Sequence, residues 1–141
     1  MKTETSSTWL PLAGVMALWA PAMIAASYEW THGAYYDYGW VVPPVAAWLL
    51  FRRWKDQRGP VGITNSLATL LVFLLLVPWF TGLRILGEAD PLWRLPIAVS
   101  GLTAAAMSHV LIAKTRGVAA SREFLWITLS LMIPWDCWHF W

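Results

Sequence analysis

The sequence predicts an all-α membrane protein, a bundle of about five transmembrane helices, on three observations. Hydrophobic residues make up 58% of the 141 residues and charged residues 13%, whereas soluble domains are about 45–50% apolar and about 25% charged. The mean hydropathy is +0.52. Twelve residues are tryptophan, which is enriched at membrane–water interfaces. These values argue against a water-soluble enzyme, a disordered tail and a nucleic-acid-binding protein.

The first expected span covers residues 9–27, which carry no charged side chain. A signal peptide combines a basic start with an apolar core of about 7–15 residues. Here Lys2 is balanced by Glu4, and the apolar stretch is longer than such a core. We therefore interpret this segment as a span that is retained in the protein.

Four further apolar stretches follow, and the second span is the least regular of them. A spanning helix needs about 20 residues, with a minimum of about 17. Residues 40–51 are too few, so this span is completed by residues 34–39, which include Asp37. The short loops leave no room for a soluble domain, so residues 1–141 are expected to form one transmembrane domain. The expected spans are residues 9–27, 34–51, 66–81, 93–113 and 124–141.

The distribution of lysine and arginine predicts the orientation of the helices. Residues 52–60 hold four of these basic residues, residues 114–123 hold three, and Lys2 is the eighth. The opposite side would carry only Arg84 and Arg94. Basic loops stay in the cytoplasm, so the N-terminus is expected there. With an odd number of spans, the last residue would then lie on the outer side.

Residues 28–40, YEWTHGAYYDYGW, place six aromatic side chains at the outer end of the second span. One interpretation is an aromatic belt, whose amphipathic rings lie at the depth of the lipid headgroups. The other is the substrate-facing rim of a membrane enzyme or receptor, which better explains Asp37 and Gly39. Pro43 and Pro44 follow inside the expected span, where proline bends a helix. Such a kink either opens a cavity or serves packing.

Polar residues inside the later spans are further candidates. His109 lies within the fourth span, where it either bonds to a neighbouring helix or has a function. Near the end of the sequence, Asp136 and His139 are three apart and can touch on a helix. Cys137 and His139 are two apart and face different ways, which argues against a cysteine–histidine nucleophile. With one cysteine and three scattered histidines, we predict no catalytic residue, metal site or cofactor. Small residues at 101–106 predict close helix packing.

Residues 36–54 resemble a segment of the exosortase and archaeosortase family. The family segment is similar to YSHGFLVP, followed by an apolar helix and a basic stop like the one at residues 49–54, LLFRRW. Asp37 replaces the family serine and Tyr38 replaces the histidine. The weaker second match is LMIP at residues 131–134, which looks like the family's FMIP segment. The matching positions of the first segment are Tyr36, Gly39, Trp40, Val42 and Pro43.

The resemblance implies a multi-pass protein of the bacterial cytoplasmic membrane that processes exported proteins. Exosortases are thought to cleave a C-terminal sorting tail, which has a Pro-Glu-Pro motif, an apolar helix and a basic end, and to transfer the protein by transpeptidation. The family's cysteine nucleophile, in an ACSGLR-like segment, and its later arginine and histidine have no match in this sequence. Cys137 lies in an unrelated Pro-Trp-Asp-Cys-Trp context.

We therefore expect this chain to correspond to the N-terminal half of an exosortase-like protein, without peptidase activity alone. Its expected partners are membrane lipids, the sorting helix of exported proteins and a C-terminal half, but no nucleic acid. The alternative is a small non-enzymatic membrane module for assembly or transport, in which the resemblance is incidental.

Overall fold

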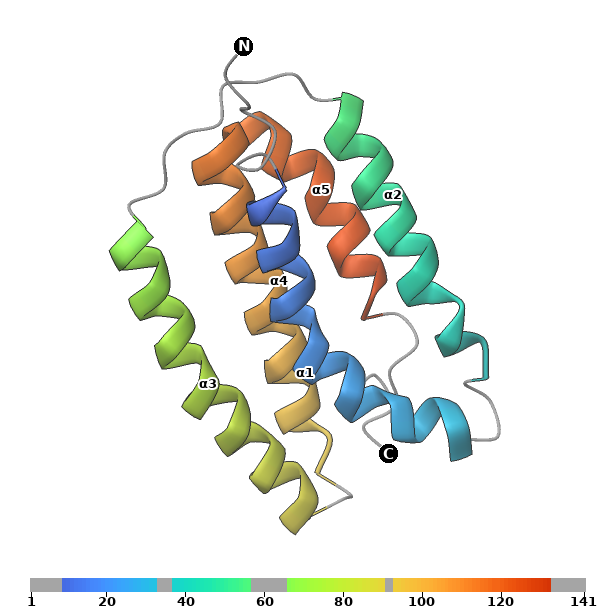
Figure 1. Ribbon diagram of the computed structural model, residues 1–141. Helices are drawn as coiled ribbons and strands as arrows, with labels where there is room; N and C mark the ends of the chain where they lie inside the picture. Colours follow the sequence, from blue (N-terminus) through green and yellow to red (C-terminus); the bar gives the residue numbers. More distant parts are fainter. Residues whose placement is uncertain (1–8, 33–36, 57–65, 91–92, 133–141) are drawn as a thin grey trace.

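The computed structural model describes residues 9–32, 37–56, 66–90 and 93–132. These residues form α-helices and one short 3-10 helix, with no strand among them, which confirms the predicted all-α class. Figure 1 shows successive helices running in alternating directions. The elements are α1 (Leu10–His32), η1 (Asp37–Trp40), α2 (Val42–Asp56), α3 (Ser66–Ala89), α4 (Leu95–Arg116) and α5 (Val118–Ser130).

Three of the described helices are long and apolar enough to cross a membrane: α1, α4 and the part of α3 from Leu70 to Ala89. The described part of α2 has 15 residues and that of α5 has 13. At a rise of about 1.5 Å per residue these measure roughly 20 Å, less than the ~30 Å hydrocarbon core. The five expected helices are therefore present in the described residues, but only three of them are shown to be long enough to cross a membrane.

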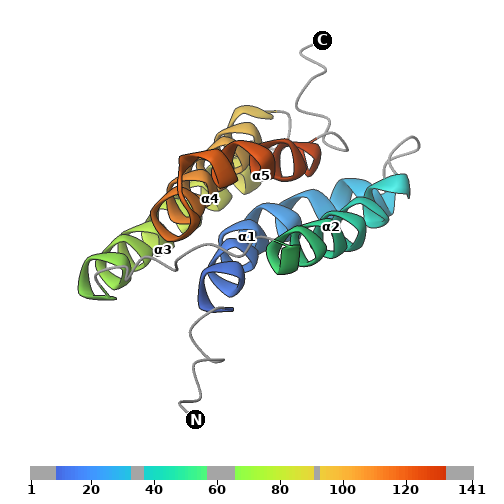
Figure 2. The ribbon, with the colours of Figure 1, turned by 90° about the horizontal axis from the view of Figure 1, so that it is seen from above.

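The alternating directions give the bundle two different ends (Figure 1). The "rim end" contains η1, the C-termini of α1 and α3 and the N-terminus of α4. The "basic end" contains the C-terminus of α2 and the connection from α4 to α5. Seen from above, α1 and α2 lie on one side and α3, α4 and α5 on the other (Figure 2). The two segments with most of the basic residues, 52–60 and 114–123, thus begin at the same end.

Helix α4 packs against α1, α3 and α5. Its buried residues include Gly101, Ala104, Ala105 and Ser108. Helices in lipid gain little from burying apolar surface, so their association depends on van der Waals contact, and small side chains permit a close approach. The close packing predicted for residues 101–106 is confirmed.

Most buried hydroxyl groups of the bundle bond to the backbone of their own helix. Ser100 Oγ donates to the Pro96 carbonyl at 2.9 Å, and Thr115 Oγ1 donates to Leu111 at 2.8 Å. A buried hydroxyl without a partner destabilises a fold, and this local pairing removes the penalty. Polar residues can therefore occupy apolar helices without contacting one another.

At the basic end, charged and aromatic side chains connect three helices. Arg53 of α2 forms an ion pair with Glu123 of α5 at 2.8 Å. Trp54 packs edge-on against Phe124, with ring centroids 5.9 Å apart. Arg116 of α4 lies over the Trp54 ring, 4.4 Å from its centroid. These contacts hold α2 beside α4 and α5.

The helix boundaries differ from the predicted spans mainly around residues 34–42. The second helix begins at Val42, not at residue 34, because residues 37–40 form η1. Pro43 and Pro44 therefore lie in the first turn of α2, where the missing N–H has no helical partner to lose. The expected kink from these prolines inside a span was wrong.

Five other boundaries lie further out than the predicted ones. Helix α1 continues to residue 32, α2 to residue 56, α3 to residue 89 and α4 to residue 116, and α5 begins at residue 118. In α3 the extension contains Arg84 and Glu88, four residues apart and paired at 2.8 Å. Such a pair stabilises a helix beyond its apolar stretch. Hydropathy locates the apolar part of a helix and not its polar ends.

We predict that Ala105→Leu, which enlarges a residue that is 4% exposed on α4, destabilises the bundle. Overpacking a close helix contact costs about 1–3 kcal/mol. Thermal unfolding in detergent micelles measures this loss. Ala106→Leu is the matched control, because Ala106 is an exposed neighbour on the same helix, and its effect should stay within about 0.5 kcal/mol. Equal effects of both variants would contradict the packing described for α4.

Candidate functional site

Part of the segment with the family resemblance, residues 37–40, forms a tight turn at the rim end. Residues 37–40 make one turn of 3-10 helix between α1 and α2 and contact both. The N–H of Val41 donates to the carbonyl of Tyr38 at 3.0 Å, which closes the turn. The turn reverses the chain and lets α2 begin beside the end of α1.

Gly39 and Trp30 fix the position of this turn. Trp30, in the last turns of α1, is 3% exposed, and Gly39 lies directly against its indole. A Cβ atom added to Gly39 would collide with the Trp30 ring. The next residue, Trp40, packs edge-on against Trp30 with ring centroids 5.5 Å apart. Glycine is required here for close approach, which gives one motif residue a structural explanation.

Several aromatic side chains remain accessible around the turn. Tyr38 is 49% exposed and Trp40 is 52% exposed. Tyr28 stacks on His32 with centroids 4.5 Å apart, and His32 Nδ1 donates to the Tyr28 carbonyl at 3.1 Å. We call Tyr28, Trp30, His32 and residues 38–40 the aromatic rim. Rings with one apolar and one polar side suit a membrane–water interface and also suit the binding of an amphipathic segment.

The predicted site residues are only partly brought together. Tyr38, Gly39 and Trp40 are neighbours in the rim, and Pro43 follows as the second residue of α2. Asp37 is the first residue of η1. Tyr36, Asp136 and His139 lie outside the described residues.

His109 lies away from the rim. It is 14 residues beyond the first residue of α4, which begins at the rim end, so it lies about 20 Å along the helix. Its ring is half-buried, and its buried Nδ1 has no hydrogen-bond partner. The neighbouring Ser108 Oγ is also buried without a partner. The structure therefore does not join His109 to the aromatic rim.

A groove between α1, α3 and α4 was not predicted from the sequence. Its volume is about 860 Å³. Apolar side chains form its walls, among them Pro21 of α1 and Phe80 of α3. Its charged lining residues are Arg84, Glu88 and Arg94.

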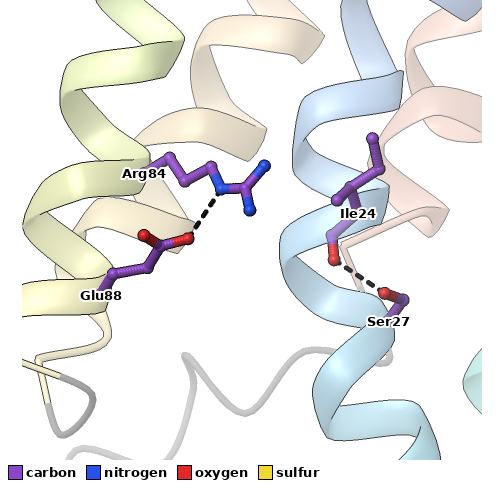
Figure 3. A network of polar contacts seen from close by, with 4 residues as sticks. All are labelled: Ile24, Ser27, Arg84 and Glu88. Atoms are coloured by element: carbon purple, nitrogen blue, oxygen red, sulfur yellow. Dashed lines mark hydrogen bonds and ion pairs between the residues drawn. The ribbon is translucent and has the colours of Figure 1, made fainter.

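The charged residues of the groove lie at the rim end. Arg84 Nε donates to Glu88 Oε1 at 2.8 Å. Figure 3 shows both side chains extending from α3 toward the part of α1 that contains Ile24 and Ser27. In the sequence, the only sign of this charged end was an arginine and a glutamate four residues apart at the end of an apolar stretch. The groove itself could not be predicted, because it is formed by three helices that are distant in the sequence.

Within the described residues, no three histidine, cysteine, aspartate or glutamate side chains lie close enough to hold a metal ion. Comparisons with protein-family models, with curated proteins and with solved structures found no match to this chain. Its function is therefore inferred from the rim, the groove and the residues themselves.

We predict that Gly39→Ala destabilises the rim, because the new methyl group displaces the Trp30 ring. The expected loss is about 1–3 kcal/mol, as for overpacked cores. It is measured by thermal unfolding in detergent, with near-ultraviolet circular dichroism reporting the tryptophans. The control is Gly82→Ala in α3, where a Cβ meets nothing within 4 Å. Replacing a helical glycine by alanine there should stabilise by about 0.5–1 kcal/mol. A Gly39→Ala protein as stable as the Gly82→Ala protein would contradict the close contact.

Proposed function

We propose that this chain is the substrate-holding, non-catalytic part of an exosortase-like membrane transpeptidase. In this role the aromatic rim binds the C-terminal sorting tail of an exported protein beside the membrane surface. The observation that carries the proposal is the Gly39–Trp30 contact, which fixes the motif residues Tyr38 and Trp40 with half-exposed rings at one end of the bundle.

The distribution of charge supports this placement. The ion pair of Arg53 with Glu123 and the cation–π contact of Arg116 lie at the end opposite the rim. Basic segments remain in the cytoplasm, so the rim faces outward in the proposed orientation. We propose further that α2 and α5 also cross the bacterial cytoplasmic membrane, giving five spans with a cytoplasmic N-terminus. A sorting tail whose apolar helix crosses the membrane and whose basic end stays inside would then present its Pro-Glu-Pro motif at the rim.

Catalysis is assigned to a partner, a C-terminal half that supplies the thiol. The chain's single cysteine, Cys137, is not in the family's nucleophile context and lies outside the described residues. The rim itself contains aromatic rings, a histidine and a glycine, but no thiol. The rim can therefore bind a peptide but lacks the nucleophile of a cysteine transpeptidase.

We expect a photo-crosslinker at position 38 to capture a sorting tail in living membranes. Tyr38 is replaced by benzoylphenylalanine, and the chain is co-expressed with a reporter protein ending in a Pro-Glu-Pro motif, an apolar helix and a basic end. The matched control places the crosslinker at Leu75, which is 71% exposed on α3, away from the rim. Irradiation should link the reporter from position 38, not from position 75, without cleaving it.

Two results would overturn the proposal. No crosslink from position 38, or a crosslink that persists when Pro-Glu-Pro is changed to three alanines, would favour a non-enzymatic assembly or transport module. Cleavage of the reporter by the chain alone, lost in Cys137→Ala, would show that the chain is itself the catalyst.

A further inference from the structure

We propose that the groove between α1, α3 and α4 binds one anionic phospholipid. An acyl chain lies along its apolar walls, and the headgroup phosphate contacts Arg84 at its charged end. This inference does not depend on the proposed function. The groove shares Tyr28 with the aromatic rim, but its other lining residues are not part of the rim.

The dimensions of the groove fit such a ligand. Its volume of about 860 Å³ lies in the range of about 300–1,000 Å³ that is usual for small-molecule sites. The small side chain of Ala17 on α1 leaves the space open, and Phe73 and Phe80 of α3 form the opposite wall. Figure 1 shows α4 between α1 and α3, so α4 closes the back of the groove.

The length of the apolar part matches one leaflet of a bilayer. Phe73 and Arg84 are eleven residues apart on α3, which corresponds to about 16 Å along the helix axis. Half of a ~30 Å hydrocarbon core is about 15 Å. An acyl chain that begins beside Arg84 therefore reaches Phe73 near the middle of the membrane.

The charged end favours an anion over a neutral headgroup. The charged side chains that line the groove are two arginines, Arg84 and Arg94, and one glutamate, Glu88. Glu88 holds Arg84 through Nε, and the other two guanidinium nitrogens point into the space between α3 and α1 (Figure 3). A guanidinium fork oriented in this way suits bidentate contact with a phosphate. A net-anionic lipid brings such a phosphate without the choline cation of a neutral headgroup, which Arg84 would repel.

The depth of this end agrees with a headgroup. Tyr28 lines the same groove and belongs to the aromatic rim. Tyrosine and tryptophan concentrate where headgroups meet hydrocarbon. The guanidinium of Arg84 therefore lies at the level at which a phosphate is found, with the apolar walls extending inward from it.

The test is native mass spectrometry of the full chain, purified in detergent and titrated with phosphatidylglycerol or with phosphatidylcholine of identical acyl chains. We expect one phosphatidylglycerol per chain, bound at least about tenfold more tightly than phosphatidylcholine, whose phosphate is accompanied by a choline cation that Arg84 repels. Arg84→Gln should abolish this preference. Glu88→Gln removes the carboxylate that competes with the phosphate for Arg84, and it should tighten phosphatidylglycerol binding. Opposite effects of the two variants on affinity would exclude misfolding as the cause of the weaker binding by Arg84→Gln.

A matched pair of variants tests the apolar walls. Ala17→Phe fills the groove and should weaken the single phosphatidylglycerol complex at least about tenfold. Ala20→Phe is the control, since Ala20 is exposed on the same helix but does not line the groove, and its affinity should equal that of the parent chain.

Three results would overturn the proposal. The two lipids could bind equally, which would remove the role of charge. Phosphatidylglycerol could bind in several equal copies with no effect of Ala17→Phe, which indicates only the lipid surrounding the bundle. The chain could form a dimer that Ala17→Phe dissociates, which would make the groove an interface between two copies.

Discussion

The close approach of α1 and α5 to α4 is the constraint on which the rest of the structure depends. Helices in lipid gain little from burying apolar surface, so tight contact requires small side chains such as Gly101, Ala104 and Ala105. Helix α3 has large apolar side chains, most of them exposed, and packs on α4. Its polar contact with α4 is a hydrogen bond from Trp79 Nε1 to Thr103 Oγ1 at 3.3 Å. Helix α1 therefore packs tightly on α4, whereas the larger side chains of α3 keep it further away. The groove is the space that this arrangement leaves between the three helices.

The two ends of the bundle are held together by different kinds of side-chain contact. The basic end is held by an ion pair and by aromatic contacts of Trp54, which tie α2 to α4 and α5. The rim end is organised by Trp30, whose contact with Gly39 positions the turn before α2. A bundle built in this way has one end held by basic and aromatic contacts, and an opposite end of aromatic rings and arginines suited to binding amphipathic molecules.

The helical class and the small-residue packing of α4 could be predicted from the sequence, because both follow from composition and local pattern. It was insufficient at the start of α2, where Gly39 and Trp30 make a contact across a turn that hydropathy does not detect. It also missed the groove, since Ala17, Phe73 and Arg84 meet only through tertiary packing. The family resemblance identified Tyr38, Gly39 and Trp40 as neighbours in a motif but not the indole that orders them. His109 and the rim, both candidates by residue type, are separated by most of the length of α4.

The central claim, that five antiparallel helices cross the membrane with the rim outside, is tested most directly by cysteine accessibility. In a Cys137→Ser background, Thr31→Cys and Asp90→Cys report the ends of α1 and α3, and Asp56→Cys reports the end of α2. A membrane-impermeant maleimide applied to intact spheroplasts should label positions 31 and 90, and should label position 56 only after permeabilisation. If only the three long helices span, the chain crosses once fewer between positions 31 and 90. Those two positions would then lie on opposite sides, which would contradict the account.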